Sequence, residues 1–363
     1  MKNEFTVKKA QITKGIAVFL LLMHHLFVNP ADWKGYEVQF FLLTTERMVK
    51  LASAAKICVA LFLFLTAYGM TVKFKREVKE DSDLARISLS KLFSILISFV
   101  FVVLFTHILW LLFGKGLNMS FYGTGITGVV GFILDTLGIS FFFNSSMINV
   151  TWWYMALLFF VLCLLPVLWK LKGFLGVMMI PAAMLLPAAI GIGGGYLAPY
   201  LLTITLGVLA ADGGWLERIG SIGEKRIAGR VFKWLVCVAL LLVCLSLRSI
   251  ASYNIITNAI AVLTIAILVN ELIGKIPVVN KVLEIFGKYS FGIFTTHSLF
   301  FIYFFDGKIF SLRYGILIFT ALAIISLFTA IIIRKLEKLC GVERLKKYVT
   351  EKIDKSFKKS VAK

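Results

Sequence analysis

Long apolar runs are the feature that most constrains how this chain can fold. A transmembrane helix needs about 20 mostly apolar residues, and ten runs of about that length occur along the 363-residue sequence. They are 12–28, 54–72, 92–113, 152–169, 174–190, 196–211, 232–250, 255–273, 289–306 and 312–333. Composition agrees, because 60% of the residues are hydrophobic and 16% are charged, whereas soluble domains average about 45–50% and about 25%. The sequence therefore predicts an all-α, polytopic membrane protein in which residues 1–333 form a single transmembrane bundle.

An eleventh apolar run, 126–143, is weaker because it contains three glycines and Asp135. If this run does not cross the membrane, the chain has ten spans and both termini lie on the same side. That side then holds 31 of the 39 Lys and Arg residues and the other side holds 6, while Lys56 and Arg248 lie inside spans. The positive-inside rule assigns the first side to the cytoplasm. If the run crosses, the basic loop at 212–233 and the basic tail face outward. We therefore expect ten spans, two cytoplasmic termini and an outer re-entrant or interfacial segment.

The net charge of +20 comes mostly from short segments between the apolar runs. In a soluble protein this charge would indicate a nucleic-acid partner. The sequence, however, has no zinc-ligand spacing, no RNA-binding aromatic motif and no basic helix outside its tail. We therefore expect no nucleic-acid partner. The tail, 334–363, is predicted to be a basic cytoplasmic segment that lies along anionic lipid.

The first span carries the most informative ionisable residues. In KGIAVFLLLMHH, Lys14 and His25 are eleven positions apart, so both project from one helix face about 16 Å apart, whereas His24 is rotated away. Ionisable residues in spans are costly and are functional candidates by default. An unperturbed histidine pKa of about 6.5 suits a proton shuttle or a general base. The alternatives are a buried histidine bonded to a neighbouring helix and, for residues 1–30, a signal peptide, although no small-residue cleavage site follows.

Other ionisable side chains in the apolar runs are weaker candidates. His297 lies mid-span, where it must face protein or water. His107 and Arg248 lie toward the outer ends of their spans, where packing or snorkelling also accounts for them. The sequence has no Gly-rich phosphate loop, no paired-histidine zinc spacing, no nucleophile elbow and no dinucleotide fingerprint. We therefore expect no metal, and neither ATP hydrolysis nor redox chemistry is indicated.

Several motifs match one known family. KGIAVFLLLMHH resembles the opening helix of the membrane-bound acyltransferase 3 family, in which Ile-Ala follows a basic residue and a histidine stands eleven positions after that residue. Further stretches resemble family segments in the family's order: VALFLFLTAYGM (59–70), TWWYMALLFFVLCLLP (151–166), LGVLAA (206–211) and LEIFGKYSFGIFTTHSLF (283–300). The last of these places His297 at a family histidine. The chain departs from the family where Thr66 and Ala67 replace the usual Ser-Gly.

The resemblance implies an O-acyltransferase with ten spans and cytoplasmic ends. Such an enzyme moves an acyl group, usually acetyl, from cytoplasmic acetyl-CoA to a hydroxyl of a surface polysaccharide or another envelope glycan. Lys14, Arg86 and Lys91 would bind the phosphates of CoA. The family often has an Arg-x-x-Arg pair leading into the third span, whereas this chain has Arg86 and Lys91 there, at a different spacing. His25 would deprotonate the acceptor hydroxyl or carry the acyl group transiently. His297 would complete the polar channel from a facing helix.

The resemblance also suggests where the acceptor binds. Trp152, Trp153 and Tyr154 stand at the outer end of the fourth span, as interface anchors or as a sugar-stacking platform. The expected location is the bacterial plasma membrane. The expected partners are membrane lipids, an envelope polysaccharide or lipid-linked glycan, and either a second copy of the chain or a glycan-assembly protein. The alternatives are a transporter or flippase for an envelope sugar, which could use the histidines as proton relays, and a non-catalytic subunit of an export complex.

Overall fold

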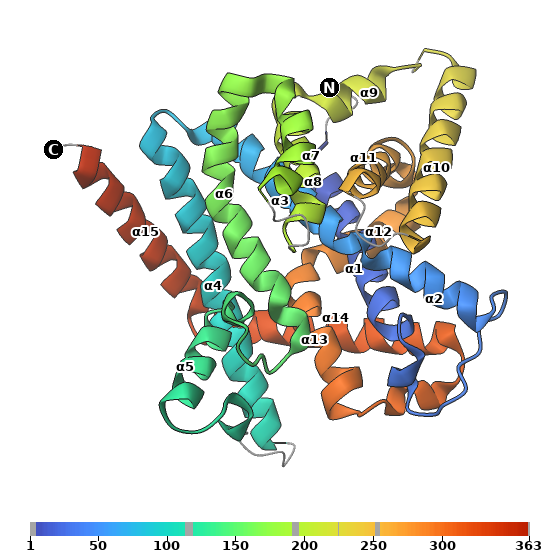
Figure 1. The fold of residues 1–363 in the computed structure, drawn as a ribbon, viewed down its shortest axis with the longest axis vertical. Helices are drawn as coiled ribbons and strands as arrows, with labels where there is room; N and C mark the ends of the chain where they lie inside the picture. Colours follow the sequence, from blue (N-terminus) through green and yellow to red (C-terminus); the bar gives the residue numbers. More distant parts are fainter. Residues whose placement is uncertain (1–4, 113–118, 191–195, 224, 251–254, 362–363) are drawn as a thin grey trace.

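The computed structural model describes residues 5–112, 119–190, 196–223, 225–250 and 255–361 (Figure 1). Within these ranges the chain is helical, with no strand and one isolated β-bridge, between Gln39 and Tyr314. The fold is therefore all-α, as the apolar runs predicted.

Fifteen α-helices follow one another along the described part of the chain. They are α1 (Val7–Phe27), α2 (Thr45–Ala54), α3 (Cys58–Glu77), α4 (Asp81–Leu112), α5 (Gly125–Thr136), α6 (Trp153–Leu175), α7 (Met179–Ala189), α8 (Ala198–Gly213), α9 (Trp215–Ser221), α10 (Ile227–Ile250), α11 (Ile255–Glu271), α12 (Pro277–Lys288), α13 (Ser290–Ser298), α14 (Gly315–Leu339) and α15 (Val342–Val361). A short π-helix, Leu299–Phe304, continues α13.

Seven helical stretches among the described residues are long and apolar enough to cross a membrane. They are Val7–Phe27, Thr45–Glu77, Asp81–Leu112, Val150–Pro187, Ile227–Arg248, Ile255–Lys275 and Gly315–Leu339. The chain is therefore a multi-pass membrane protein.

Three predicted spans do not form separate long helices. The run at 174–190 forms α7 after Gly176, whose positive φ of 54° ends α6. The run at 196–211 forms the 16-residue α8, and the run at 289–306 forms the shorter apolar stretch Ser290–Phe304. The predicted total of ten crossings, and the cytoplasmic termini that depend on it, stay predictions.

The weak eleventh run folds around a buried carboxylate. Its helix, α5, has 12 residues and is therefore about 18 Å long. The hydrocarbon core of a bilayer is about 30 Å thick, so α5 is too short to cross it. The Asp135 carboxylate accepts hydrogen bonds from the Tyr122 hydroxyl and the Ile148 backbone N–H, both at 2.8 Å. Figure 1 shows this segment beside the lower end of α4, against which α5 packs. Its length suits the expected interfacial or re-entrant segment.

The first helix lies at the centre of the bundle, where α2, α3, α11, α12, α13 and α14 all pack against it. Its closest neighbour is α12. A Cβ atom added at Gly15 would overlap the backbone oxygen of Leu283, and one added at Gly287 would overlap the backbone oxygen of Gln11. Glycines at these positions therefore let the two helix backbones touch, as small residues do in other membrane bundles.

The basic tail forms α15, which packs along α4 (Figure 1). An Arg86 guanidinium nitrogen lies 2.9 Å from the Asp354 carboxylate, which joins α4 to α15. The Lys346 ammonium lies 3.8 Å from the Glu337 carboxylate, which joins α15 to α14. This end of the chain is therefore packed against the bundle.

Candidate functional site

Two histidines from distant parts of the sequence meet inside the bundle. His25 near the end of α1 and His297 in α13 have ring centroids 5.0 Å apart. His297 is fully buried and His25 is partly buried. The neighbouring His24 instead places its Nδ1 2.8 Å from the backbone oxygen of Ala52. The ring centroids of His24 and His25 are also 5.0 Å apart. His297 is therefore the imidazole from another helix that meets His25.

Hydrogen bonding fixes which nitrogen of neutral His297 carries the proton. Its Nδ1 lies 2.8 Å from the Phe294 carbonyl oxygen and 3.1 Å from the Ile293 carbonyl oxygen. Because a carbonyl oxygen only accepts, Nδ1 must be the donor, and Nε2 holds the lone pair. That Nε2 is buried and has no hydrogen-bond partner among the described residues. A nitrogen of this kind beside another imidazole can accept a proton or an N–H bond.

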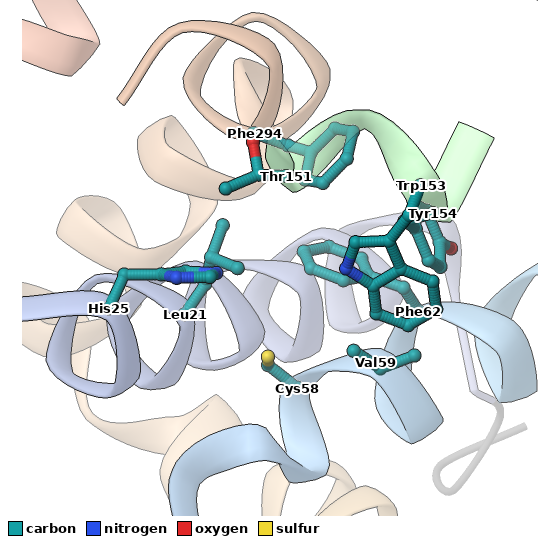
Figure 2. A pocket seen from close by; sticks show the side chains of 9 residues that line it. All are labelled: Leu21, His25, Cys58, Val59, Phe62, Thr151, Trp153, Tyr154 and Phe294. Carbon is teal, nitrogen blue, oxygen red and sulfur yellow. The ribbon is translucent and has the colours of Figure 1, made fainter. Parts of the chain in front are cut away.

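His25 opens into a small cavity of about 20 Å³, which we call the histidine chamber (Figure 2). Its lining consists of Leu21, His25, Cys58, Val59, Phe62, Thr151, Trp153, Tyr154 and Phe294. Figure 2 shows the His25 ring pointing into the chamber from α1, with the Trp153 indole opposite. The surroundings are mostly apolar and aromatic, so a reacting group held here is largely surrounded by protein, beside one imidazole.

A larger cavity of about 730 Å³, which we call the basic cavity, adjoins the chamber and shares part of its wall. Among the described residues its lining includes six cationic side chains, each from a different helix: Lys14, Lys73, Lys91, Lys288, Arg334 and Lys346. Two carboxylates, Glu337 and Glu343, also line it. The volume of the cavity lies within the range of about 300–1,000 Å³ that is usual for pockets that bind small molecules. Lysine and arginine bind phosphate through charge-assisted hydrogen bonds, so the basic cavity suits a phosphorylated small molecule.

The three residues predicted to bind CoA have different surroundings. Lys14 and Lys91 line the basic cavity. The guanidinium of Arg86 is paired instead with the carboxylates of Asp83, at 2.8 Å, and Asp354, at 2.9 Å. In the described structure Arg86 therefore links α4 to α15 and is not part of the cavity lining.

Of the three aromatic residues predicted to hold an acceptor, two line the chamber and Trp152 lines neither cavity. Trp152 is only 1% exposed, and its indole N–H donates to the Thr295 carbonyl oxygen at 2.9 Å. It therefore packs the start of α6 against α13. Trp153 lines the histidine chamber, and Tyr154 lines both the chamber and the basic cavity.

Sequence reasoning missed a buried polar cluster beside His297. The Asn149 side-chain oxygen accepts hydrogen bonds from the Thr151 backbone N–H at 3.1 Å, the Thr151 hydroxyl at 2.9 Å and the Ser298 hydroxyl at 2.9 Å. Ser298 directly follows His297, and Thr151 lines the chamber. The cluster therefore fixes the chamber wall against α13. The signal in the sequence was an asparagine just before an apolar run, which is a helix-start residue.

Comparison with known proteins gives one match. The model of the acyltransferase 3 family, described as an acyltransferase domain, matches residues 9–335, from α1 into the last part of α14. A search of the curated proteins and a search of the solved structures each found no match. The matched range contains every residue that lines the histidine chamber.

Proposed function

Because the chain belongs to the acyltransferase 3 family of membrane acyltransferases, we propose that it moves an acyl group from cytoplasmic acyl-CoA to a hydroxyl of an envelope glycan or lipid-linked sugar. The acyl group we propose is acetyl, and the location is the bacterial plasma membrane. The observation that carries the proposal is that a single helix, α1, presents Lys14 to the basic cavity and His25 to the adjoining chamber. The charged end and the reactive end of one donor can therefore engage the same helix.

The donor would lie across the two cavities. CoA is anionic at its phosphate end and carries the acyl thioester at the other end of a long arm. We place its phosphates among the cations of the basic cavity, beside Lys14 and Lys91, where charge-assisted hydrogen bonds can form. The thioester then points toward His25. The acceptor would enter on the Trp153 side of the chamber, where the indole offers a flat face to a sugar ring.

His25 would act as the general base. It takes the proton of the acceptor hydroxyl as the hydroxyl oxygen attacks the thioester carbonyl carbon. The carbon–sulfur bond then breaks, and the departing CoA thiolate takes the proton from His25, which returns to its neutral form. The Nε2 lone pair of His297 can accept the N–H of His25 and so orient its ring. A positioned general base contributes about 10²–10⁴-fold to a rate.

The experiment that tests this function follows the label of acetyl-CoA. Acetyl-CoA labelled in its acetyl group is supplied at the cytoplasmic face of proteoliposomes that contain the purified protein. Crude envelope glycan is the acceptor. CoA release and label on the glycan are measured for the wild type, His25→Ala and His24→Ala. The His24→Ala variant is the matched control, because it removes an adjacent imidazole that bonds Ala52 and does not line the chamber.

We expect transfer to be lost in His25→Ala and kept in His24→Ala. Absence of CoA turnover with every envelope fraction, from protein shown to be folded, would overturn the proposal. Proton-driven sugar flux without CoA consumption would then identify a transporter or flippase.

A further inference from the structure

Three aromatic side chains line both the basic cavity and the histidine chamber. Phe62 comes from α3, Tyr154 from α6 and Phe294 from α13. The ring of Tyr154 lies between the other two, with its centroid 6.2 Å from that of Phe62 and 5.1 Å from that of Phe294. Tyr154 and Phe294 are each only 7% exposed. We call these three residues the aromatic septum.

The two functional ends of α1 lie on opposite sides of this septum. Lys14 lines the basic cavity and not the chamber, whereas His25 lines the chamber and not the basic cavity. A donor held by the cations must therefore pass its acyl end through the septum to reach His25. Figure 2 shows Phe62 and Tyr154 on the side of the chamber away from His25.

We propose that the aromatic septum is a gate that sets the length of the acyl chain, so that only short acyl groups reach His25. This inference rests on the proposed acyltransferase function. The chamber has about 20 Å³ of free space, against about 730 Å³ for the basic cavity. Its lining side chains must therefore already move for a thioester carbonyl and an acceptor hydroxyl to meet there. Protein interiors are packed as densely as organic crystals. Each added methylene would therefore have to displace a septum ring or a chamber side chain.

The gate can be tested without measuring acyl transfer, because Cys58 lines the chamber and is 1% exposed. Cys58 is kept as the single thiol, with the other four cysteines replaced by serine. Purified protein in proteoliposomes is treated, at the cytoplasmic face only, with a membrane-impermeant anionic methanethiosulfonate, which the basic cavity attracts. The septum variants are Phe62→Ala and Phe294→Ala. The matched control is Phe291→Ala, which removes the same side chain from a wall of the basic cavity outside the septum.

We expect slow labelling of Cys58 in the wild type and in Phe291→Ala, and labelling at least about tenfold faster in both septum variants, since each loses an aromatic contact. Phe62→Leu and Phe294→Leu should give intermediate rates and serve if an alanine variant does not fold. Equal rates in all variants, or fast labelling of the wild type, would overturn the gate.

Chain-length selectivity is the second measurement. Acetyl-CoA, butyryl-CoA and hexanoyl-CoA are compared as donors. The ratio of butyryl to acetyl transfer should rise at least about tenfold in Phe62→Ala and Phe294→Ala, and should not change in Phe291→Ala. An unchanged ratio in active septum variants would contradict a role in selectivity. A further outcome separates the two proposals: the wild type transfers no acyl group, while Phe62→Ala and Phe294→Ala still speed the labelling of Cys58. In that case the acyltransferase proposal fails and the barrier between the cavities stands.

Discussion

The imidazole rings of His25 and His297 lie 5.0 Å apart, centroid to centroid, on helices from opposite ends of the chain. The Nδ1 of His297 is bonded to backbone oxygens, so its Nε2 lone pair is the nitrogen left for a partner. Only His25 of the two lines the chamber. We therefore propose that His297 positions His25, and that the two act as one unit.

A double-mutant cycle tests that unit. His25→Ala should lower kcat by about 10²–10⁴-fold, and His297→Ala should lower it by a similar factor. Residues that act together are strongly non-additive, so the double variant should be no slower than His25→Ala within error. The cycle is completed with steady-state kinetics of CoA release. Multiplicative losses would show that His297 acts independently of His25.

Two basic residues of α4 should differ in their effect on CoA binding. Lys91 lines the basic cavity, whereas Arg86 is paired with Asp354. We expect Lys91→Ala to raise the Kd for CoA about tenfold, the size typical of a lost hydrogen bond to a charged group. Arg86→Ala, one to two turns away on the same helix, should leave the Kd within a factor of about two, because Arg86 does not line the basic cavity. Titration calorimetry with CoA checks both, and a larger effect at Arg86 would reverse the assignment.

Removal of the Asn149 side chain should destabilise the chamber wall. Asn149→Ala leaves the hydroxyls of Thr151 and Ser298 without their shared acceptor, so the free energy of unfolding should fall by about 1–3 kcal/mol. Transfer activity should fall as well, because Ser298 adjoins His297. Ser146→Ala is the control, since Ser146 is an exposed residue of the same loop. Thermal denaturation in one detergent compares the two, and equal melting temperatures would refute the role of Asn149.

The contact between α1 and α12 should not tolerate a methyl group. A Cβ at position 287 would overlap the backbone of Gln11, so Gly287→Ala must push the helices apart, at a cost of about 1–3 kcal/mol. Gly173→Ala in α6 is the control, because a Cβ there meets nothing within 4 Å and alanine favours a helix by about 1 kcal/mol over glycine. We expect the melting temperature to fall in Gly287→Ala only. A parallel fall in Gly173→Ala would mean that the contact is not the cause.

Much of the fold could be predicted from the sequence, because apolar runs determine where membrane helices form. Each of the ten runs is helical over most of its length. The lengths were less predictable, since α6 continues past the predicted end of its run to Leu175 and leaves only 11 residues for α7. The eleventh run was separable from the others because glycines and Asp135 interrupt it.

The site was predictable where it depends on one helix and not where it depends on several. The spacing of Lys14 and His25 is a property of α1 alone, so the sequence shows it. Lys288 and Arg334 belong to α12 and α14 and reach the basic cavity only after those helices pack. Arg86 has a charge and a sequence position that suit a phosphate-binding residue. Its carboxylate partner in α15 could not be inferred from periodicity.

The basic cavity takes its wall from both ends of the chain, with Lys14 in α1 and Lys346 in α15. During synthesis the first helix enters the membrane long before the last one leaves the ribosome. A nascent chain therefore has its histidine on α1 in place while the cavity that would bind its donor is still incomplete. Completion of the wall is a late event in biogenesis, and a ribosome-bound intermediate that lacks α15 should bind CoA less tightly than the finished protein.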